Sequence, residues 1–251
     1  MQNTDFTIEN GVLKAYKGTS AQVIVPDAVT AVGKSAFSRD ENLTSVTISD
    51  SVRRIGAGAF FGCENLTEIT IPRSVQIIGT DAFSFCGGLR SIIVDPQNPA
   101  FYSDEDGVLY DKKQTTLIRY PEGKAQTAFA IPESVDSIGR FAFLSCNHLR
   151  SVTIPNSVRR IEEGAFRFCT GLASVTIPEG VTSIDDFTFE ACTNLLEITI
   201  PKSVTRIGAF AFDGCMRLRT VLYSGSEADR DRIRINISAI TSPFIKWLCG
   251  E

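Results

Sequence analysis

The sequence predicts an α/β solenoid that is mainly β, and a strict internal repeat is the main reason. A frame of 23 residues recurs in two blocks. It opens at Val23, Val46, Ile69 and Ile92, then at Phe129, Val152, Val175, Ile198 and Val221. One coil of this length cannot bury its apolar residues alone, so stacked coils must share a continuous core.

Three positions of the frame are nearly invariant between coils. The first position is Phe at Phe37, Phe60, Phe83, Phe143, Phe166, Phe189 and Phe212. Three residues later, Cys occupies Cys63, Cys86, Cys146, Cys169, Cys192 and Cys215, with Asp40 as the exception. Three residues further on comes Leu at Leu43, Leu66, Leu89, Leu149, Leu172, Leu195 and Leu218. These residues are the predicted core.

Each frame begins with a predicted strand. Ile69 and Ile71 stand two residues apart, so they point to one side of the strand, and Thr70 faces the other side. Pro follows most of these strands and ends the pairing there because it lacks an N–H. The Ala-Phe-x-x-Cys-x-x-Leu spacing favours a short helical or 3₁₀ turn at the back. We expect about nine right-handed coils that form one parallel sheet.

A period of this length with a Leu-x-x-Ile-x-Ile core is typical of leucine-rich repeats. The runs from Ile71-Pro72-Arg73-Ser74-Val75 to Leu89 and from Ile154-Pro155 to Leu172 resemble the BspA-type leucine-rich repeat of bacterial and protist proteins. The resemblance covers nearly the whole chain, including Tyr223-Ser224-Gly225, although the family's usual Trp soon after this motif is absent. The resemblance implies an adhesive surface protein that binds host proteins, extracellular-matrix proteins or other cells.

The repeat blocks divide the chain into segments of one predicted domain, residues 1–251. Residues 1–22 form an N-terminal cap hairpin around Asn10-Gly11, which is a strong turn signal. Repeats follow at 23–94 and 129–223, and 95–128 form an insertion with a predicted hairpin of strands 107–110 and 116–120 beside the stack. Residues 224–251 form a C-terminal cap, with a capping box from Ser226 to Asp229. Its apolar residues, expected to fold back over the last coil, are Phe244, Ile245, Trp247 and Leu248.

Composition excludes several partners. A net charge of −4 and a pI near 5.2 give no basic surface for nucleic acid. No apolar run reaches the roughly 20 residues that cross a bilayer. The first residues lack the pattern of a secretory signal. Localisation therefore stays open between the cell surface or secretion, which the resemblance implies, and the cytoplasm. We expect a monomer.

The residues that could carry chemistry have simpler explanations. The repeated Cys residues face inward, so we expect buried free thiols and no zinc site, since close Cys pairs are missing. His148 is the lone histidine and is expected to face solvent, away from Cys146. The acidic run Asp104-Glu105-Asp106 fails the EF-hand register. We expect no cofactor and no enzyme activity.

Surface positions that depart from Thr and Ser are the candidate partner contacts. On the sheet face these are Glu68, Arg90, Ile93, Arg150, Leu196 and Glu197, and in the insertion they are Tyr102, Tyr110, Arg119 and Tyr120. Tyr and Arg often dominate interface energy. We expect a protein partner at the hairpin and the adjacent sheet edge, and deletion of 97–126 should spare the fold. Alternatives are a passive scaffold or intracellular interaction protein, a glycan-binding module, and Thr ladders that merely suit a wet sheet.

Overall fold

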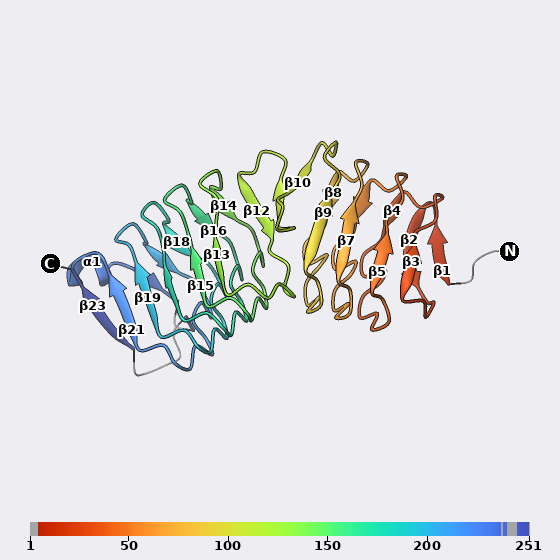
Figure 1. The fold of residues 1–251 in the computed structure, drawn as a ribbon. Coiled ribbons are helices and arrows are strands. Elements are labelled where there is room, and N and C mark those ends of the chain that lie inside the picture. Colours follow the sequence, from red (N-terminus) through yellow and green to blue (C-terminus); the bar gives the residue numbers. More distant parts are fainter. Residues whose placement is uncertain (1–4, 237, 240–244, 251) are drawn as a thin grey trace. The chain divides into compact units, whose positions relative to one another are not determined.

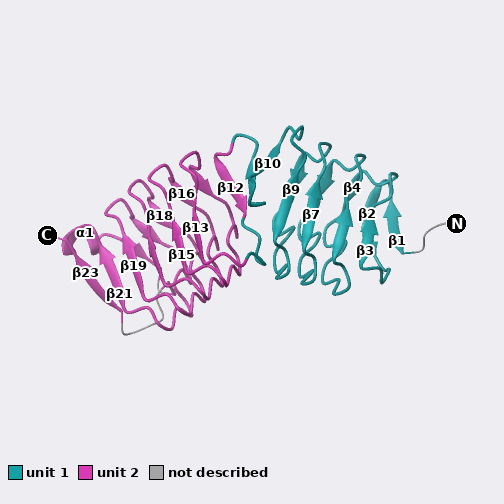
Figure 2. Ribbon diagram, in the orientation of Figure 1, with its two compact units in different colours: residues 1–113, 120–124 teal, residues 114–119, 125–251 magenta. Residues whose placement is uncertain are grey.

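The computed structural model describes residues 5–236, 238–239 and 245–250 (Figure 1). The chain forms two compact units, coloured separately in Figure 2. Unit 1 comprises residues 1–113 and 120–124, and unit 2 comprises 114–119 and 125–251. Each unit is a stack of β coils, as the repeat predicts. The expectation that both belong to one domain stays a prediction.

The predicted strands open each coil. They form parallel sheets of four strands in unit 1 and of six strands in unit 2, rather than one sheet. The four are β3 (Gln22–Ile24), β5 (Ser45–Thr47), β7 (Glu68–Ile71) and β9 (Ser91–Val94). The six are β13 (Ala128–Ala130), β15 (Ser151–Thr153), β17 (Ser174–Thr176), β19 (Glu197–Ile200), β21 (Thr220–Tyr223) and β23 (Lys246–Cys249). We call the outward side of these strands the front face.

The register of the front strands follows the repeat. Val46 pairs with Ile69 and Ile69 pairs with Ile92, so equivalent residues of neighbouring coils lie side by side. All three are buried, whereas Thr47 and Thr70 are exposed. The predicted alternation of inward apolar and outward polar residues is confirmed.

A second row of short parallel strands completes the coils. In unit 1 these are β4 (Ala31–Val32), β6 (Arg54–Ile55) and β8 (Ile77–Ile78). In unit 2 they are β12 (Thr116–Arg119), β14 (Ser137–Ile138), β16 (Arg160–Ile161), β18 (Ser183–Ile184), β20 (Arg206–Ile207) and β22 (Arg234–Ile235). Gly56 allows this close stacking, because a Cβ there would lie 2.7 Å from the backbone of Gly33 and Lys34.

The back of each coil consists of linked turns instead of the expected helical or 3₁₀ turn. Backbone bonds of 3₁₀ spacing do occur, such as Phe61 N–H to Gly58 O at 3.0 Å and Cys63 N–H to Phe60 O at 3.1 Å. Left-handed residues interrupt them, with φ of +58° at Gly58 and +73° at Gly62. A helix cannot continue through such residues. In the described ranges, the one α-helix is α1 (Glu227–Arg230).

The repeated Phe and Cys residues form ladders inside each unit. Phe166 stacks between Phe143 at 4.9 Å and Phe189 at 5.3 Å, measured between ring centroids. The Cys192 thiol donates to the Phe166 carbonyl at 3.1 Å, and Cys215 donates to Phe189 at 3.0 Å. The predicted burial of the six repeated thiols is confirmed.

Hairpin and helix signals at the chain ends are confirmed. β1 (Phe6–Glu9) and β2 (Val12–Tyr16) pair antiparallel around Asn10 and Gly11, whose φ values of +49° and +74° suit a type I′ turn. Ser226 and Asp229 form the capping box of α1.

The C-terminal residues complete the front sheet of unit 2. The tail extends this sheet through β23, which pairs in parallel with β21, and Trp247 contacts Tyr223 edge-to-face. Phe244 lies outside the described residues. No helix among those that the structure describes is long and apolar enough to cross a membrane.

The insertion does not project beside the stack as predicted, because it belongs to the core. β10 (Phe101–Ser103) and β11 (Leu109–Asp111) form an antiparallel hairpin in unit 1, around a turn that Asp104 closes by accepting from the Val108 N–H. β12 pairs in parallel with β14 in the second row of unit 2. Leu109 and Leu117 are fully buried, so the segment does not project from the stack. Deletion of 97–126 is therefore expected to disrupt the fold, contrary to the sequence-based expectation.

Two polar side chains of the insertion take the place of a missing coil in unit 1. The Gly62 N–H donates to the Ser84 carbonyl of the next coil at 2.8 Å, and the equivalent Phe85 N–H donates to the Glu122 carboxylate at 2.7 Å. Buried Asn98 donates to the carbonyls of Pro72 and Val75. The insertion thus satisfies backbone groups that a regular coil would otherwise bond.

Candidate interaction surfaces

The candidate residues of unit 1 are spread over its front face. Glu68 is exposed between Ser45 and Ser91 in the strand register. Ile93 is 41% exposed beside Thr70, and Arg90 is exposed just before β9. These side chains provide one acid, one base and one apolar group on the front face.

The candidates in the insertion are mostly unavailable to a partner. Tyr110, Arg119 and Tyr120 are buried, with 2%, 5% and 1% of their surfaces exposed. The Tyr110 hydroxyl donates to Asp104 at 3.0 Å, and the Arg119 guanidinium donates to the Phe141 carbonyl. Their assignment as contact residues is therefore wrong, because they hold the fold together. Tyr102 remains half-buried on β10.

Unit 2 brings two of the predicted residues into one groove. Arg150 and Leu196 both line a hollow of about 400 Å³ beside the N-terminal ends of the front strands. The other lining residues come from these and neighbouring coils: Thr127, Asn147, His148, Thr170, Gly171, Ala173, Asn194 and Arg217. We call this hollow the Arg150 groove.

The groove exists because one coil presents small residues where its neighbours present large ones. Gly171 occupies the repeat position of His148 and Asn194, and Ala173 occupies that of Arg150 and Leu196. The neighbouring side chains therefore stand on either side of a floor that lacks a long side chain. Gly171 also packs so closely on the Asn147 carbonyl that a Cβ would overlap it.

A ladder of polar side chains fixes one wall of the groove. Asn147 Oδ1 accepts from the Thr170 hydroxyl at 2.8 Å, and Asn194 Nδ2 donates to the Thr170 carbonyl at 2.7 Å. Arg217 Nη1 then donates to Asn194 Oδ1 at 3.0 Å. Each bond joins successive coils, so these groups are positioned before any partner arrives.

The electrostatic character of the groove is basic. Arg150 and Arg217 contribute cations, and none of its lining residues is acidic. Lys246 is exposed on the adjoining front face, where half-buried Glu197 is the acidic neighbour of Thr220 in the register. Leu196 is 43% exposed and adds an apolar surface. The groove can thus accept carboxylates together with an apolar group.

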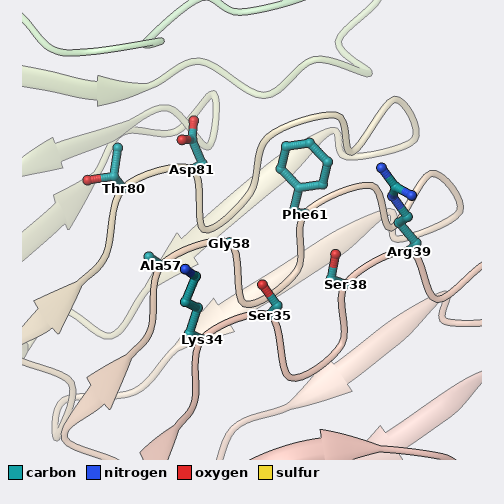
Figure 3. Close-up of a pocket in the computed structure, with 9 residues that line it drawn as sticks. All are labelled: Lys34, Ser35, Ser38, Arg39, Ala57, Gly58, Phe61, Thr80 and Asp81. Carbon is teal, nitrogen blue, oxygen red and sulfur yellow. The ribbon is translucent and has the colours of Figure 1, made fainter.

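A second hollow, of about 550 Å³, lies at the back turns of unit 1 (Figure 3). Three successive coils line it: Lys34, Ser35, Ser38 and Arg39, then Ala57, Gly58 and Phe61, then Thr80 and Asp81. Gly58 leaves its centre open, because a Cβ there would meet nothing closer than 3.6 Å. We call this hollow the Gly58 socket.

Within the described part of the chain, the structure brings together neither a metal cluster nor the Cys146–His148 pair. Among the described residues, no group of three or more His, Cys, Asp and Glu side chains could hold a metal ion. His148 is exposed on the groove, whereas Cys146 is buried in the core, so the two do not converge. Burial raises the pKa of the Cys192 thiol well above its ordinary value, which disfavours a reactive thiolate.

Sequence reasoning found Arg150 and Leu196 but missed the residues that turn them into a groove. Gly171 and Ala173 were the available signal, since both are small at positions where sister coils carry large side chains. Arg217 lies at the position of Asn194 and was also missed. An exception to the repeat can matter because it lacks a side chain, not only because it adds one.

Comparisons with known proteins agree with this architecture. The family model of the BspA type leucine rich repeat region matches residues 7–105 and 120–229, in six copies. A comparison with proteins of curated function gives no match.

Solved structures of bacterial repeat proteins are similar to the chain. A leucine rich cell surface protein from Faecalibacterium prausnitzii is 38% identical with a TM-score of 0.71, and the match covers 85% of this chain and 62% of that one. A leucine-rich repeat protein from Bacteroides ovatus is 26% identical with a TM-score of 0.57, and the match covers 92% of this chain and 64% of that one. Pneumococcal vaccine antigen PcpA shares the fold at 21% identity and a TM-score of 0.79, covering 92% and 62%. This chain thus spans less than two thirds of each of these proteins.

Proposed function

The chain belongs to the BspA type leucine-rich-repeat family, and on this premise we propose that it is a non-enzymatic module that binds an acidic segment of a protein partner in the Arg150 groove. Proteins with leucine-rich repeats generally serve as interaction modules. The basic, preformed groove is the observation that supports this site most directly. The description of the Faecalibacterium relative as a cell surface protein supports a role at the bacterial surface.

The position of the cations suggests how such a segment would lie. Arg150 and Arg217 belong to coils three steps apart, and strands stack roughly 4.8 Å apart, so the two coils are about 14 Å apart. An extended peptide advances about 3.4 Å per residue. Two carboxylates four residues apart would therefore reach both guanidinium groups, with an apolar residue between them near Leu196.

The polar ladder favours binding by reducing its entropic cost. Arg217 is already held by Asn194, so less side-chain freedom is lost when a carboxylate arrives. Arginine also suits carboxylates because its planar fork can form two parallel hydrogen bonds. The contribution of these charges should weaken as salt increases, since the groove is open to solvent.

Binding can be tested with a labelled peptide that carries two Asp residues four positions apart around a Leu. The same peptide with Asn in place of both Asp residues serves as the ligand control. We expect the Asp peptide to bind more tightly, and we expect Arg150→Glu to lower its affinity at least tenfold. Arg160→Glu makes the same charge change on β16 and should leave the affinity unchanged. Fluorescence anisotropy over a range of salt concentrations measures each affinity.

The same variants should then be used to capture partners from extracellular matrix and from bacterial surface extracts. A partner lost with Arg150→Glu but retained with Arg160→Glu supports the groove as the binding site. Equal capture by both variants would place the site elsewhere. Absence of any captured partner, together with no preference for the Asp peptide, would favour a passive scaffold.

A further inference from the structure

We infer that the Gly58 socket in unit 1 is a second recognition site, which receives an aromatic side chain from a protein partner. The inference concerns a different unit from the Arg150 groove and does not depend on it. It rests on an internal comparison, because unit 2 contains the equivalent site with an aromatic ring already in place.

In unit 2, the ring of Phe141 covers Gly164 of the next coil. A Cβ on Gly164 would overlap the Cε1 and Cδ1 atoms of this ring, and Gly164 is accordingly buried. The Arg140 guanidinium lies 5.5 Å from the centroid of the Phe141 ring, in a cation–π arrangement. The site thus consists of a glycine floor, an aromatic ring and a cation from the preceding residue.

Unit 1 repeats this site without the ring. Gly58 corresponds to Gly164, Lys34 corresponds to Arg140, and Ser35 occupies the place of Phe141. Gly58 is only half-buried, and the nearest atoms to a Cβ built on it are Phe61 Cβ and Ser35 Oγ, both at 3.6 Å. The glycine floor and the cation are therefore present, while the place of the ring is open (Figure 3).

The backbone at the two sites has closely similar φ angles. Ser35 and Gly58 have φ of +55° and +58°, and Phe141 and Gly164 have φ of +55° and +62°. Backbone bonds also correspond, since Gly58 N–H donates to the Thr80 carbonyl and Gly164 N–H donates to the Asp186 carbonyl, each at 3.0 Å. A ring that fits over Gly164 in unit 2 should therefore fit over Gly58 in unit 1.

The surroundings of the socket suit a ring from outside the chain. Phe61 replaces Arg167 at its side and offers an aromatic wall that already contacts Phe85 edge-to-face at 5.1 Å. Lys34 is exposed and can lie over an incoming ring, as Arg140 does over Phe141. The same column of unit 2 is filled further along, where Phe187 and Phe210 stack at 5.3 Å.

A polypeptide is the expected source of the ring. The socket covers one face of a ring, so a free aromatic molecule would bind only weakly, because little contact offsets the entropy lost on binding. A residue anchored in a larger interface avoids most of that cost, and aromatic residues are enriched among interface residues with large energetic contributions. We therefore assign the socket to a Phe or Tyr side chain of a protein partner.

The test uses N-acetyl-phenylalanine amide as the probe and N-acetyl-leucine amide as the apolar control. Amide shifts in ¹H–¹⁵N spectra of the full chain report binding. We expect saturable shifts at Ser35, Gly58 and Thr80 with the phenylalanine probe and much smaller shifts with leucine. Ser35→Phe should abolish them, because it supplies the ring as Phe141 does.

Two further variants make the result specific. Ser145→Phe adds a ring at another left-handed serine, φ +58°, in unit 2 and should leave the shifts intact. Lys34→Ala removes an exposed cation and should weaken binding about two- to fivefold. Equal shifts with leucine, shifts that persist in Ser35→Phe, or unchanged affinity in Lys34→Ala would each overturn the assignment.

Discussion

The stacked Phe ladder allows the contribution of neighbouring coils to be measured one ring at a time. Phe166 lies between two rings, Phe143 and Phe189, with interplanar angles of 9° and 5°. Phe212 contacts one ladder ring, Phe189, at 5.6 Å. Both side chains are buried, at 0% and 2% exposure, so they form a matched pair for replacement by Leu.

The structure predicts a larger loss at Phe166. An aromatic pair contributes about 0.5–1.5 kcal/mol beyond its burial, so losing two pairs costs about 1–3 kcal/mol and losing one costs about half as much. The smaller Leu leaves a similar void at both positions, which adds a comparable penalty to each variant. The difference in unfolding free energy should therefore be about 0.5–1.5 kcal/mol.

Urea unfolding followed by circular dichroism and by Trp247 fluorescence would measure both losses, since this tryptophan lies on β23 of the same unit. The unfolding free energy of both variants and of the parent protein must depend on urea concentration with the same slope, because repeat arrays can depart from two-state unfolding. A double-mutant cycle of Phe166→Leu and Phe189→Leu isolates their coupling. Equal losses at Phe166 and Phe212, together with no coupling in the cycle, would refute the ladder as a source of stability.

Three further predictions concern the Asn98 amide and the cysteine thiols. Asn98→Ala should cost about 2–4 kcal/mol of unfolding free energy in urea, since its side chain bonds four backbone groups; Asn98→Asp, which keeps the acceptor, tests the donors separately. Burial raises the pKa of Cys215 to about 12 from 9.0. The unfolded chain therefore loses this proton first, and stability should fall from pH 9 towards 12 by about 1.4 kcal/mol per unit, less steeply in Cys215→Ala. Finally, an alkylating reagent should modify half-buried Cys249 in the native protein and all seven cysteines in denaturant without reductant; far fewer in denaturant would indicate disulfides.

The repeat made the front strands and the core predictable. Val46, Ile69 and Ile92 occupy one frame position. Once the core-facing side of one strand was assigned, the burial of all three residues followed. The capping box at Ser226 was predictable for a similar reason, since it depends on two residues close in the sequence. Such features follow from local spacing.

The second strand row and the insertion were not predictable in this way. The strands of that row are mostly two residues long, such as Arg54–Ile55, and depend on bonds between stacked coils. The insertion shows the same limit, because Leu109 and Tyr110 look suitable for an exposed hairpin until the surrounding residues bury them. Its Glu122 resembles a surface acid in sequence and nevertheless replaces a backbone carbonyl.

The interaction surfaces were only partly predictable. Arg150 and Leu196 stood out because each breaks the pattern of its column. Gly171 and Ser35 did not, since a missing side chain creates a hollow only when its neighbours in three dimensions are known. Left-handed φ values were equally hidden, because Phe occupies such positions at Phe85 and Phe187.

Site-specific photo-crosslinking tests the central claim about the Arg150 groove most directly. A photoreactive amino acid placed at Ala173, on the groove floor, should form an adduct with the acidic peptide and with any captured protein partner. The same amino acid at Arg160, on the exposed second row of unit 2, should not. Adducts formed equally from both positions, or from Arg160 alone, would contradict the assignment of the groove as the binding site.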